Sequence, residues 1–216
     1  MATLIYIADP LCSWCYGFGP ELAGLLTGLP GLPIQFVVGG LRAYNKESMD
    51  QTQIDTIRSH WKAVEASTSL PFRNDGLLRT DFIYDTEPAC RAVKAAEILA
   101  PATVFDVFHS IQHAFYADSR DMTQGSELAA VASAAMSAAG TPTDAAAFLQ
   151  VWEDAATVRA TGKDFLQTQR WGIDGFPTLV LERDGQLDLV TSGYMRTEAL
   201  VEKMQALVDT ESDAAA

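Results

Sequence analysis

Two cysteines near the start of the chain stand between a buried strand and a helix, and this setting restricts the fold more than any other feature. The run from Thr3 to Ala8 is apolar and ends at Asp9-Pro10, which is typical of a buried strand closed by a proline turn. The cysteines at positions 12 and 15 follow at once, and a helical pattern extends from Ser13 to Leu26. A second apolar strand is predicted from Ile34 to Val38. The start of the chain therefore predicts a βαβ unit.

The middle of the chain has a different pattern. From about Lys46 to Arg159 we find no convincing strand but several stretches with helical spacing. These stretches are Pro88 to Leu99, Val104 to Tyr116, Ser126 to Ala139 and Ala145 to Thr157. This part is therefore predicted to be all-helical.

Mixed structure returns after Gly162. A short helix through Phe165 and Leu166 is followed by a strand from Phe176 to Leu181, and Asp184-Gly185 is a strong hairpin signal. The remaining predicted elements are a strand from Gln186 to Thr191, an amphipathic helix from Thr197 to Val208, and a polar, alanine-rich tail. We predict an α/β fold whose halves, residues 1–45 (βαβ) and 161–208 (αββα), are separated by an all-helical insertion at 46–160, with a disordered tail at 209–216.

The composition limits the partners that the chain can have. Hydrophobic residues make up 48% of the 216 residues and charged residues 20%, as is usual for a folded globular protein. The formal net charge of −13 disfavours a nucleic-acid backbone or an anionic membrane surface. The chain has no run of about 18 apolar residues and no secretory pattern at its N-terminus. We therefore expect a cytoplasmic protein with no nucleic-acid or membrane partner.

The close cysteine pair carries the predicted chemistry. The chain has three cysteines, too few for a disulfide scaffold, and in a reducing compartment a close pair is more often catalytic or metal-binding. The unpaired N–H groups and the dipole at a helix N-terminus favour an anion. We therefore predict Cys12 as the attacking thiolate and Cys15, one turn inside the helix, as the resolving thiol.

At this point the chain resembles a known family. The segment from Asp9 to Phe18 is similar to the active-site segment of DsbA-type thioredoxin-fold proteins, specifically their cytoplasmic, FrnE-like branch. Pro20 stands where such proteins commonly kink the active-site helix, and Gly175-Phe176-Pro177-Thr178 resembles their cis-proline loop. The resemblance extends over nearly the whole chain, because the family also inserts a helical domain between the two halves. It implies a thioredoxin-like fold.

The resemblance also implies roles for single residues. Pro177 would be cis, would exclude metal from the dithiol, and would leave neighbouring backbone groups free to accept substrate as an added strand. With Trp14 at the rim, we predict substrate contacts for Trp14, Phe176 and Pro177. The supporting residues would be Ser13, Pro20, Gly175 and Thr178.

Two departures from the family pattern affect the predicted direction of electron flow. Ser13-Trp14 replaces the Pro-His of strongly oxidising members, and Tyr6 stands where related enzymes often carry a buried acid. Without a histidine between the cysteines, we expect a less oxidising couple. Reduction and isomerisation of disulfides are therefore as well supported as oxidation.

The predicted function is that of a thiol–disulfide oxidoreductase or isomerase acting on protein, peptide or small-molecule disulfides. We expect small thiols as partners, glutathione as the one co-substrate to consider, and no other cofactor. One alternative is a glutathione-dependent enzyme of the kappa-class transferase or hydroxychromene-carboxylate isomerase type. Another is a peptide-binding or metal-responsive module that uses the dithiol as a ligand.

Other residues that could carry chemistry are given simpler interpretations. Cys90 is predicted to be a small buried hydrophobe on a helix. His109 and His113 have a spacing that can bind metal, but no third ligand is evident, and we predict no metal site.

Overall fold

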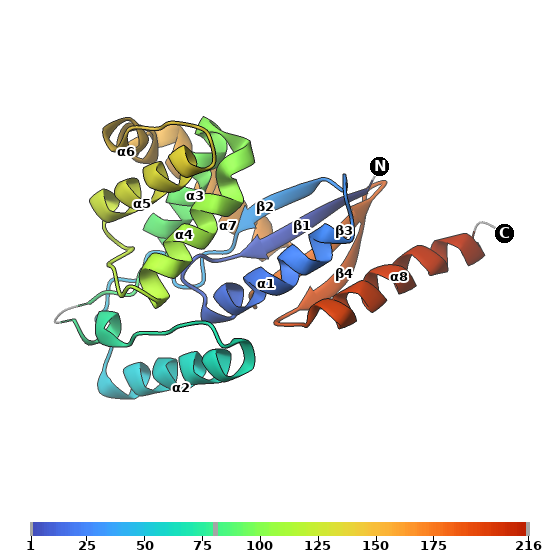
Figure 1. Cartoon of the computed structure of the whole chain (residues 1–216), viewed down its shortest axis with the longest axis horizontal. Helices are drawn as coiled ribbons and strands as arrows, with labels where there is room; N and C mark the ends of the chain where they lie inside the picture. The colour runs from blue at the N-terminus through green and yellow to red at the C-terminus, as the bar shows by residue number, and fades with distance from the viewer. Residues whose placement is uncertain (1, 80–81, 215–216) are drawn as a thin grey trace.

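The fold is built on a four-stranded mixed sheet. The computed structural model describes residues 2–79 and 82–214. Strands β1 (Ala2–Ala8) and β2 (Ile34–Val38) are parallel and are joined by helix α1 (Ser13–Thr27). Strands β3 (Thr178–Arg183) and β4 (Gln186–Ser192) are antiparallel, and the sheet order is β2-β1-β3-β4 (Figure 1). The predicted hairpin is confirmed, since Asp184 and Gly185 both have positive φ angles between β3 and β4.

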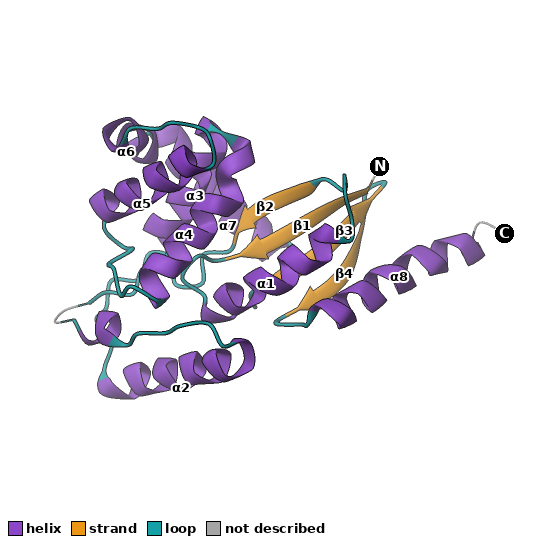
Figure 2. Ribbon diagram, in the orientation of Figure 1, coloured by secondary structure: helices purple, strands orange, loops and turns teal. Residues whose placement is uncertain are grey.

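Strand β1 lies at the centre of the sheet and is covered on both faces. Leu4 and Tyr6 pack on the face that α1 covers. Ile5 and Ile7 pack on the opposite face, against Trp171 and Ile173. Figures 1 and 2 show α1 and the C-terminal helix α8 (Thr197–Ala214) in front of the sheet, with α7 behind it. This two-sided burial explains why β1 is a continuous apolar run rather than an alternating one.

The described residues in the middle of the chain form helices and loops, as predicted, apart from an isolated β-bridge between Ser48 and Ile83. Its helices are α2 (Gln51–Thr68), α3 (Glu87–Leu99), α4 (Val104–Tyr116), α5 (Gly125–Ala138), α6 (Ala145–Glu153) and α7 (Ala155–Arg170), with short 3₁₀ turns at Asp75–Leu78 and Pro101–Thr103. The block sits at one end of the sheet (Figure 2).

The sheet and the helical block share one aromatic core. The ring of Phe36 in β2 lies 4.7 Å from that of Phe108 in α4, and Tyr6 in β1 lies 6.0 Å from the same ring. These residues belong to one cluster of buried side chains that extends from the strands into α3, α4 and α5. The α/β class and the thioredoxin-like order with a helical insertion are confirmed.

Some element boundaries differ from the prediction. The predicted helix from Ala145 to Thr157 is two helices, because Asp154 is extended (ψ 137°) and its carboxylate caps α7 by accepting a 2.6 Å hydrogen bond from the Ala156 N–H. The short helix predicted through Phe165 is the end of α7, which crosses the expected boundary at residue 160.

The ends of the C-terminal elements also differ. Strand β3 begins at Thr178, two residues after the predicted start and directly after Pro177, which has no N–H to donate to a neighbouring strand. Helix α8 continues to Ala214, through most of the segment that we expected to be disordered. Residues 215 and 216 lie outside the described part. Within the described residues, no helix combines the length and the apolar character needed to cross a membrane.

Candidate active site

The two cysteines occupy different environments at the start of α1. Cys12 is the N-cap residue, with an extended backbone (φ −93°, ψ 119°), and its N–H donates to the Asp9 carbonyl at 3.1 Å. Its side chain makes no capping bond, so the thiol lies at the open N-terminal end of the helix. Cys12 is 6% exposed, whereas Cys15, one turn along, is fully buried. All three cysteines are free thiols.

The loop before β3 faces the first cysteine, as the resemblance implied. The Phe176-Pro177 peptide bond is cis, and the Cys12 thiol lies 3.5 Å from the Phe176 carbonyl oxygen. These two residues are 164 positions apart in the sequence. Strand β3 pairs with β1, and β1 leads directly into Cys12, so the sheet brings the loop and the thiol together.

The backbone groups of this loop are less open than we predicted. The Phe176 carbonyl accepts a 3.5 Å hydrogen bond from the Cys12 thiol, and the Pro177 carbonyl accepts a 2.7 Å hydrogen bond from the Gly193 N–H. The Gly175 carbonyl accepts the Thr178 hydroxyl at 2.8 Å. Three carbonyls of the loop thus each accept one hydrogen bond, from the thiol, from the segment after β4 and from the loop itself.

The Phe176 ring lies in space that is free only because residue 39 is a glycine. An added Cβ at Gly39 would clash with the Phe176 ring, which occupies that space. Gly39 also continues the pairing of β2, since its N–H donates to the Ala8 carbonyl at 2.8 Å. The Gly39-Gly40 pair that ends β2 therefore shapes the site, a role that we did not assign to it.

An aromatic pair forms the rim on the other side. The Trp14 ring lies 5.5 Å from that of Tyr194, and both side chains are partly exposed. The Tyr194 hydroxyl donates to Glu21 at 2.8 Å, and Glu21 also accepts a 2.8 Å bond from the Thr197 N–H at the start of α8. Nothing in the sequence around Tyr194 or Glu21 indicates this contact, because it joins α1 to the segment after β4.

The remaining predicted site residues lie along the same two segments. Ser13 is the first residue of α1 and is half-buried, and Pro20 is inside α1 and exposed. Thr178 begins β3 and is buried.

A buried carboxylate organises the turn that leads into Cys12. Asp9 is fully buried and accepts hydrogen bonds from the N–H groups of Leu11 at 2.8 Å and Leu41 at 2.7 Å. The Cys90 thiol of α3 lies 3.5 Å from the same carboxylate. Burial raises the pKa of Asp9, and hydrogen bonds from Thr86 and these groups oppose the shift. Asp9 thus ties the active-site turn to both the Gly39-Gly40 segment and the helical block.

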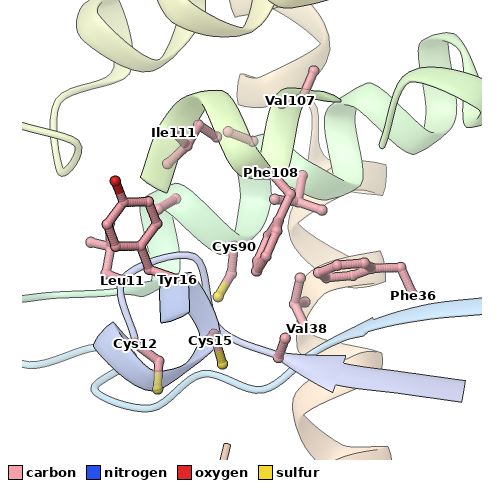
Figure 3. Packing of buried hydrophobic residues seen from close by; sticks show 14 of the residues in the cluster. Leu11, Cys12, Cys15, Tyr16, Phe36, Val38, Cys90, Val107, Phe108 and Ile111 are labelled. Carbon is pink, nitrogen blue, oxygen red and sulfur yellow. The ribbon is translucent and has the colours of Figure 1, made fainter. Parts of the chain in front are cut away.

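Tyrosines support this turn from the helical side. The Tyr84 hydroxyl, fully buried, donates to the Leu11 carbonyl at 2.6 Å. Tyr16 stacks on Tyr116 of α4 with ring centres 5.0 Å apart. Figure 3 shows Cys90 extending from α3 toward the first turn of α1, and Tyr16 pointing away from the Cys12 sulfur.

Burial makes the Cys15 thiol and the neighbouring Tyr6 hydroxyl harder to ionise. Burial raises the pKa of Cys15 well above its usual value, and the neighbouring Cys12 adds to the increase. Tyr6 lies fully buried close to both thiols, and burial followed by their proximity raises its pKa as well. Ionisation of Cys15 is therefore disfavoured.

The other candidate residues do not join this site. Cys90 is fully buried, and burial with the nearby Asp9 raises the pKa of its thiol. His113 is exposed and lies 3.4 Å from Asp118, while His109 lines a separate cavity beside α1. No group of three or more His, Cys, Asp or Glu side chains in the described part of the chain is arranged to hold a metal ion.

A cysteine pair that opens a helix opposite a cis-proline loop, on a sheet of this order, defines a thioredoxin-fold dithiol protein. The chain belongs to the thioredoxin family, whose model matches residues 5–201. No curated protein sequence matches it.

Solved structures agree with this assignment. A candidate protein disulfide isomerase from Nitrosomonas europaea is 33% identical with a TM-score of 0.86, covering 97% of this chain and 98% of that one. The cytosolic disulfide reductase DsbM from Pseudomonas aeruginosa is 26% identical with a TM-score of 0.72, covering 98% and 99%. A 2-hydroxychromene-2-carboxylate isomerase shares the fold at 15% identity and a TM-score of 0.67, covering 99% and 100%. The predicted resemblance to DsbA-like oxidoreductases is confirmed.

Proposed function

We propose that the protein is a thiol–disulfide oxidoreductase in which Cys12 is the nucleophile and Cys15 the resolving thiol. The observation that carries the proposal is the position of the Cys12 thiol, at the open end of α1 and 3.5 Å from the carbonyl of the cis-proline loop. The buried, hard-to-ionise Cys15 supports the division of labour between the thiols.

The proposed cycle transfers two electrons. The Cys12 thiolate attacks one sulfur of a substrate disulfide, forming a mixed disulfide and releasing the other substrate sulfur, which takes up a proton. Cys15 then loses its proton and attacks the Cys12 sulfur, so the second substrate thiol leaves and a Cys12–Cys15 disulfide remains. The substrate is reduced and the dithiol oxidised, and two molecules of an external thiol restore the dithiol.

Substrate would bind across the rim formed by Trp14, Phe176 and Pro177. An extended peptide that pairs with the Phe176 carbonyl would lie beside the Cys12 thiol, which is 3.5 Å from the same oxygen. Ser13, Pro20, Gly175 and Thr178 would support this geometry. We propose protein and peptide disulfides as substrates and the cytoplasm as the location.

Reduction is the favoured direction, with glutathione as the external thiol and no other cofactor. DsbM, which is 26% identical, is described as a cytosolic disulfide reductase, and a related structure of it contains glutathione. A cavity of about 560 Å³ that includes Gly39 also has Arg159 and Lys163 in its wall. Gly39 lies against the Phe176 ring, so these cations would hold the carboxylates of a small thiol on the side of the cis-proline loop.

Insulin reduction with glutathione as the reductant tests the proposal. Cys12→Ser should reduce the rate to that of glutathione alone, because the attacking sulfur is gone. Cys15→Ser should accumulate a mixed disulfide that mass spectrometry detects. Cys90→Ser is the matched control and should keep turnover within about twofold, because Cys90 takes no part in the cycle and a serine hydroxyl can still donate to Asp9. Full turnover by Cys12→Ser would overturn the proposal.

A glutathione-dependent isomerase or transferase is the second candidate, favoured by the cationic wall of the cavity beside Gly39. Calorimetry with glutathione separates the two. Tight non-covalent binding together with unchanged activity in Cys15→Ser would favour the second candidate, because that chemistry needs only one activating thiol.

A further inference from the structure

A tyrosine hydroxyl is buried beneath the first turns of α1. Tyr6, in the central strand β1, is fully buried, and its side chain lies on the face of the sheet that α1 covers. Its ring lies 5.9 Å from that of Phe18, which stands three residues after Cys15 and so on the same side of α1. This contact places Tyr6 under the part of the helix that carries the resolving thiol.

The surroundings of Tyr6 are apolar rings and the two thiols. Its ring lies 5.3 Å from Phe36, 6.3 Å from Phe105 and 6.0 Å from Phe108. The hydroxyl is buried, and it makes no hydrogen bond of ordinary geometry with the described residues. Both thiols are its charged neighbours, and Cys15 is also within hydrogen-bonding reach. Because an unpaired buried hydroxyl is unfavourable and rare, its position beside Cys15 needs an explanation.

The resolving step of the proposed cycle requires a negative charge on a fully buried sulfur. Burial raises the pKa of Cys15 most, and the neighbouring Cys12 and the Asp9 carboxylate also oppose its ionisation. The backbone N–H of Asp9 acts in the opposite direction and favours the thiolate. A further hydrogen-bond donor at the Cys15 sulfur would therefore increase the fraction of reactive thiolate.

Tyr6 is suited to be that donor. Burial, followed by the two thiols, raises the pKa of Tyr6 well above its usual value, so the hydroxyl keeps its proton at neutral pH. Among the charged neighbours of Tyr84 and Tyr116 are Cys12 and Asp9, whereas Cys15 comes first for Tyr6. A hydrogen bond to an anion is stronger than one to a neutral group, so the hydroxyl gains most when Cys15 ionises.

We propose that the Tyr6 hydroxyl donates a hydrogen bond to the Cys15 thiolate and so speeds resolution of the mixed disulfide. Cys15 gives its proton to solvent, and its sulfur attacks the Cys12 sulfur. The substrate sulfur leaves with the electron pair of the broken S–S bond, and Tyr6 keeps its proton throughout. This inference rests on the proposed function, to which it adds a catalytic residue in β1.

Reaction with the aromatic disulfide dithiobis(nitrobenzoate), followed by stopped-flow absorbance, measures the two steps separately. Attack by Cys12 releases one coloured thiolate at a rate proportional to the reagent concentration. Resolution by Cys15 releases a second coloured thiolate at a rate that does not depend on that concentration. All proteins carry Cys90→Ser, so the dithiol supplies the only thiols of a chain that has three cysteines.

Tyr6→Phe removes only the hydroxyl. The rate of the first release should stay within about twofold, and the second should fall about 3- to 10-fold, because the thiolate forms less often although it is the better nucleophile. The midpoint of urea unfolding should not fall, since the folded dithiol form makes no ordinary hydrogen bond with this hydroxyl.

Tyr16→Phe is the matched control. It also removes one tyrosine hydroxyl next to the dithiol, but Tyr16 points away from the Cys12 sulfur, and the charged neighbour of its hydroxyl is Asp118 (Figure 3). Both rates should stay within about twofold of those of the parent protein.

The possible failures have different signatures. Release of only one coloured thiolate per parent protein would overturn the proposed function, and this inference with it, because Cys15 would not resolve the mixed disulfide. Two releases with an unchanged second rate in Tyr6→Phe would overturn only the role of Tyr6. Equal slowing of both rates, or a loss of stability, would also overturn that role, because Tyr6 would then act through packing alone.

Discussion

At the scale of single residues, the candidate site depends on Gly39, which has no side chain and so leaves space for the Phe176 ring. The Phe176 ring fills the space above Gly39, and the Phe176 carbonyl holds the Cys12 thiol. Gly39 does not have a positive φ angle, so its role is the close approach of the ring rather than backbone strain. The position of the cis-proline loop therefore depends on a residue in another strand.

Gly39→Ala should lower the rate of insulin reduction about 10- to 100-fold, because the added Cβ displaces Phe176 and with it the loop that faces Cys12. The cost in free energy of unfolding should be about 1–3 kcal/mol, as for other overpacked sites. The measurements are the reduction rate and urea unfolding.

The control for this substitution is Gly28→Ala at the exposed C-cap of α1. Its added Cβ would lie 3.4 Å from the Leu25 carbonyl oxygen, an ordinary contact, and its φ is −79°. Both its activity and its stability should stay close to those of the wild type. Wild-type activity in Gly39→Ala would contradict the role assigned to Gly39.

At the scale of elements, helix α1 holds the site together by contacting α2, α4 and α8 as well as carrying the thiols. Its contact with α8 is polar and centres on Glu21, which binds the Thr197 N–H and the Tyr194 hydroxyl. Burial alone would raise the pKa of Glu21, but the hydrogen bonds from Thr197 and Tyr194 outweigh it and hold the pKa below its usual value. The ionised carboxylate therefore anchors both the start of α8 and the rim residue Tyr194.

Glu21→Gln should lower the free energy of unfolding by about 1 kcal/mol at pH 7, as for loss of a helix cap. Because the folded-state pKa is depressed, the ionised Glu21 stabilises the fold above the unfolded pKa of about 4.3, and this contribution is lost as the pH falls through the folded value. Urea unfolding should thus show the difference between wild type and Glu21→Gln at pH 7 and a smaller difference near pH 3. A stability difference between wild type and Glu21→Gln that grows as the pH falls would contradict this prediction, because it would mean that the ionised carboxylate does not stabilise the fold.

At the scale of the whole molecule, the sheet and the helical insertion share one aromatic core, and we therefore expect them to unfold as one cooperative unit. Phe108 of α4 packs on Phe36 and Tyr6 of the sheet, and the hydroxyl of Tyr84 reaches across to the Leu11 carbonyl. The contacts that hold the active-site turn are therefore also contacts between the two parts of the fold.

Phe108→Ala should lower the free energy of unfolding by about 3–5 kcal/mol, as for other large buried aromatic side chains. Because both parts lose support, unfolding by urea should remain a single transition in which circular dichroism and tryptophan fluorescence coincide. Two separated transitions in the variant or in the wild type would mean that the insertion unfolds independently.

The sequence by itself determined the parts of the fold that depend on neighbouring residues. The apolar run before Asp9-Pro10, the helix that begins after Cys12 and the Asp184-Gly185 hairpin each follow from local propensity, and all three are observed. The break at Asp154 has a local signal too, since Asp is a strong N-cap, but the alanine-rich helical pattern on either side concealed it.

Only the tertiary structure decided what surrounds the thiols. The 164-residue separation of Cys12 and Phe176, the bond from Asp9 to Leu41 and the contact of Trp14 with Tyr194 arise when the strands pair and α1 packs on its neighbours. Burial, which disfavours ionisation of Cys15, is likewise a property of the assembled core. Local sequence sets backbone preference, whereas long-range packing sets the distances and the dielectric environment on which reactivity and binding depend.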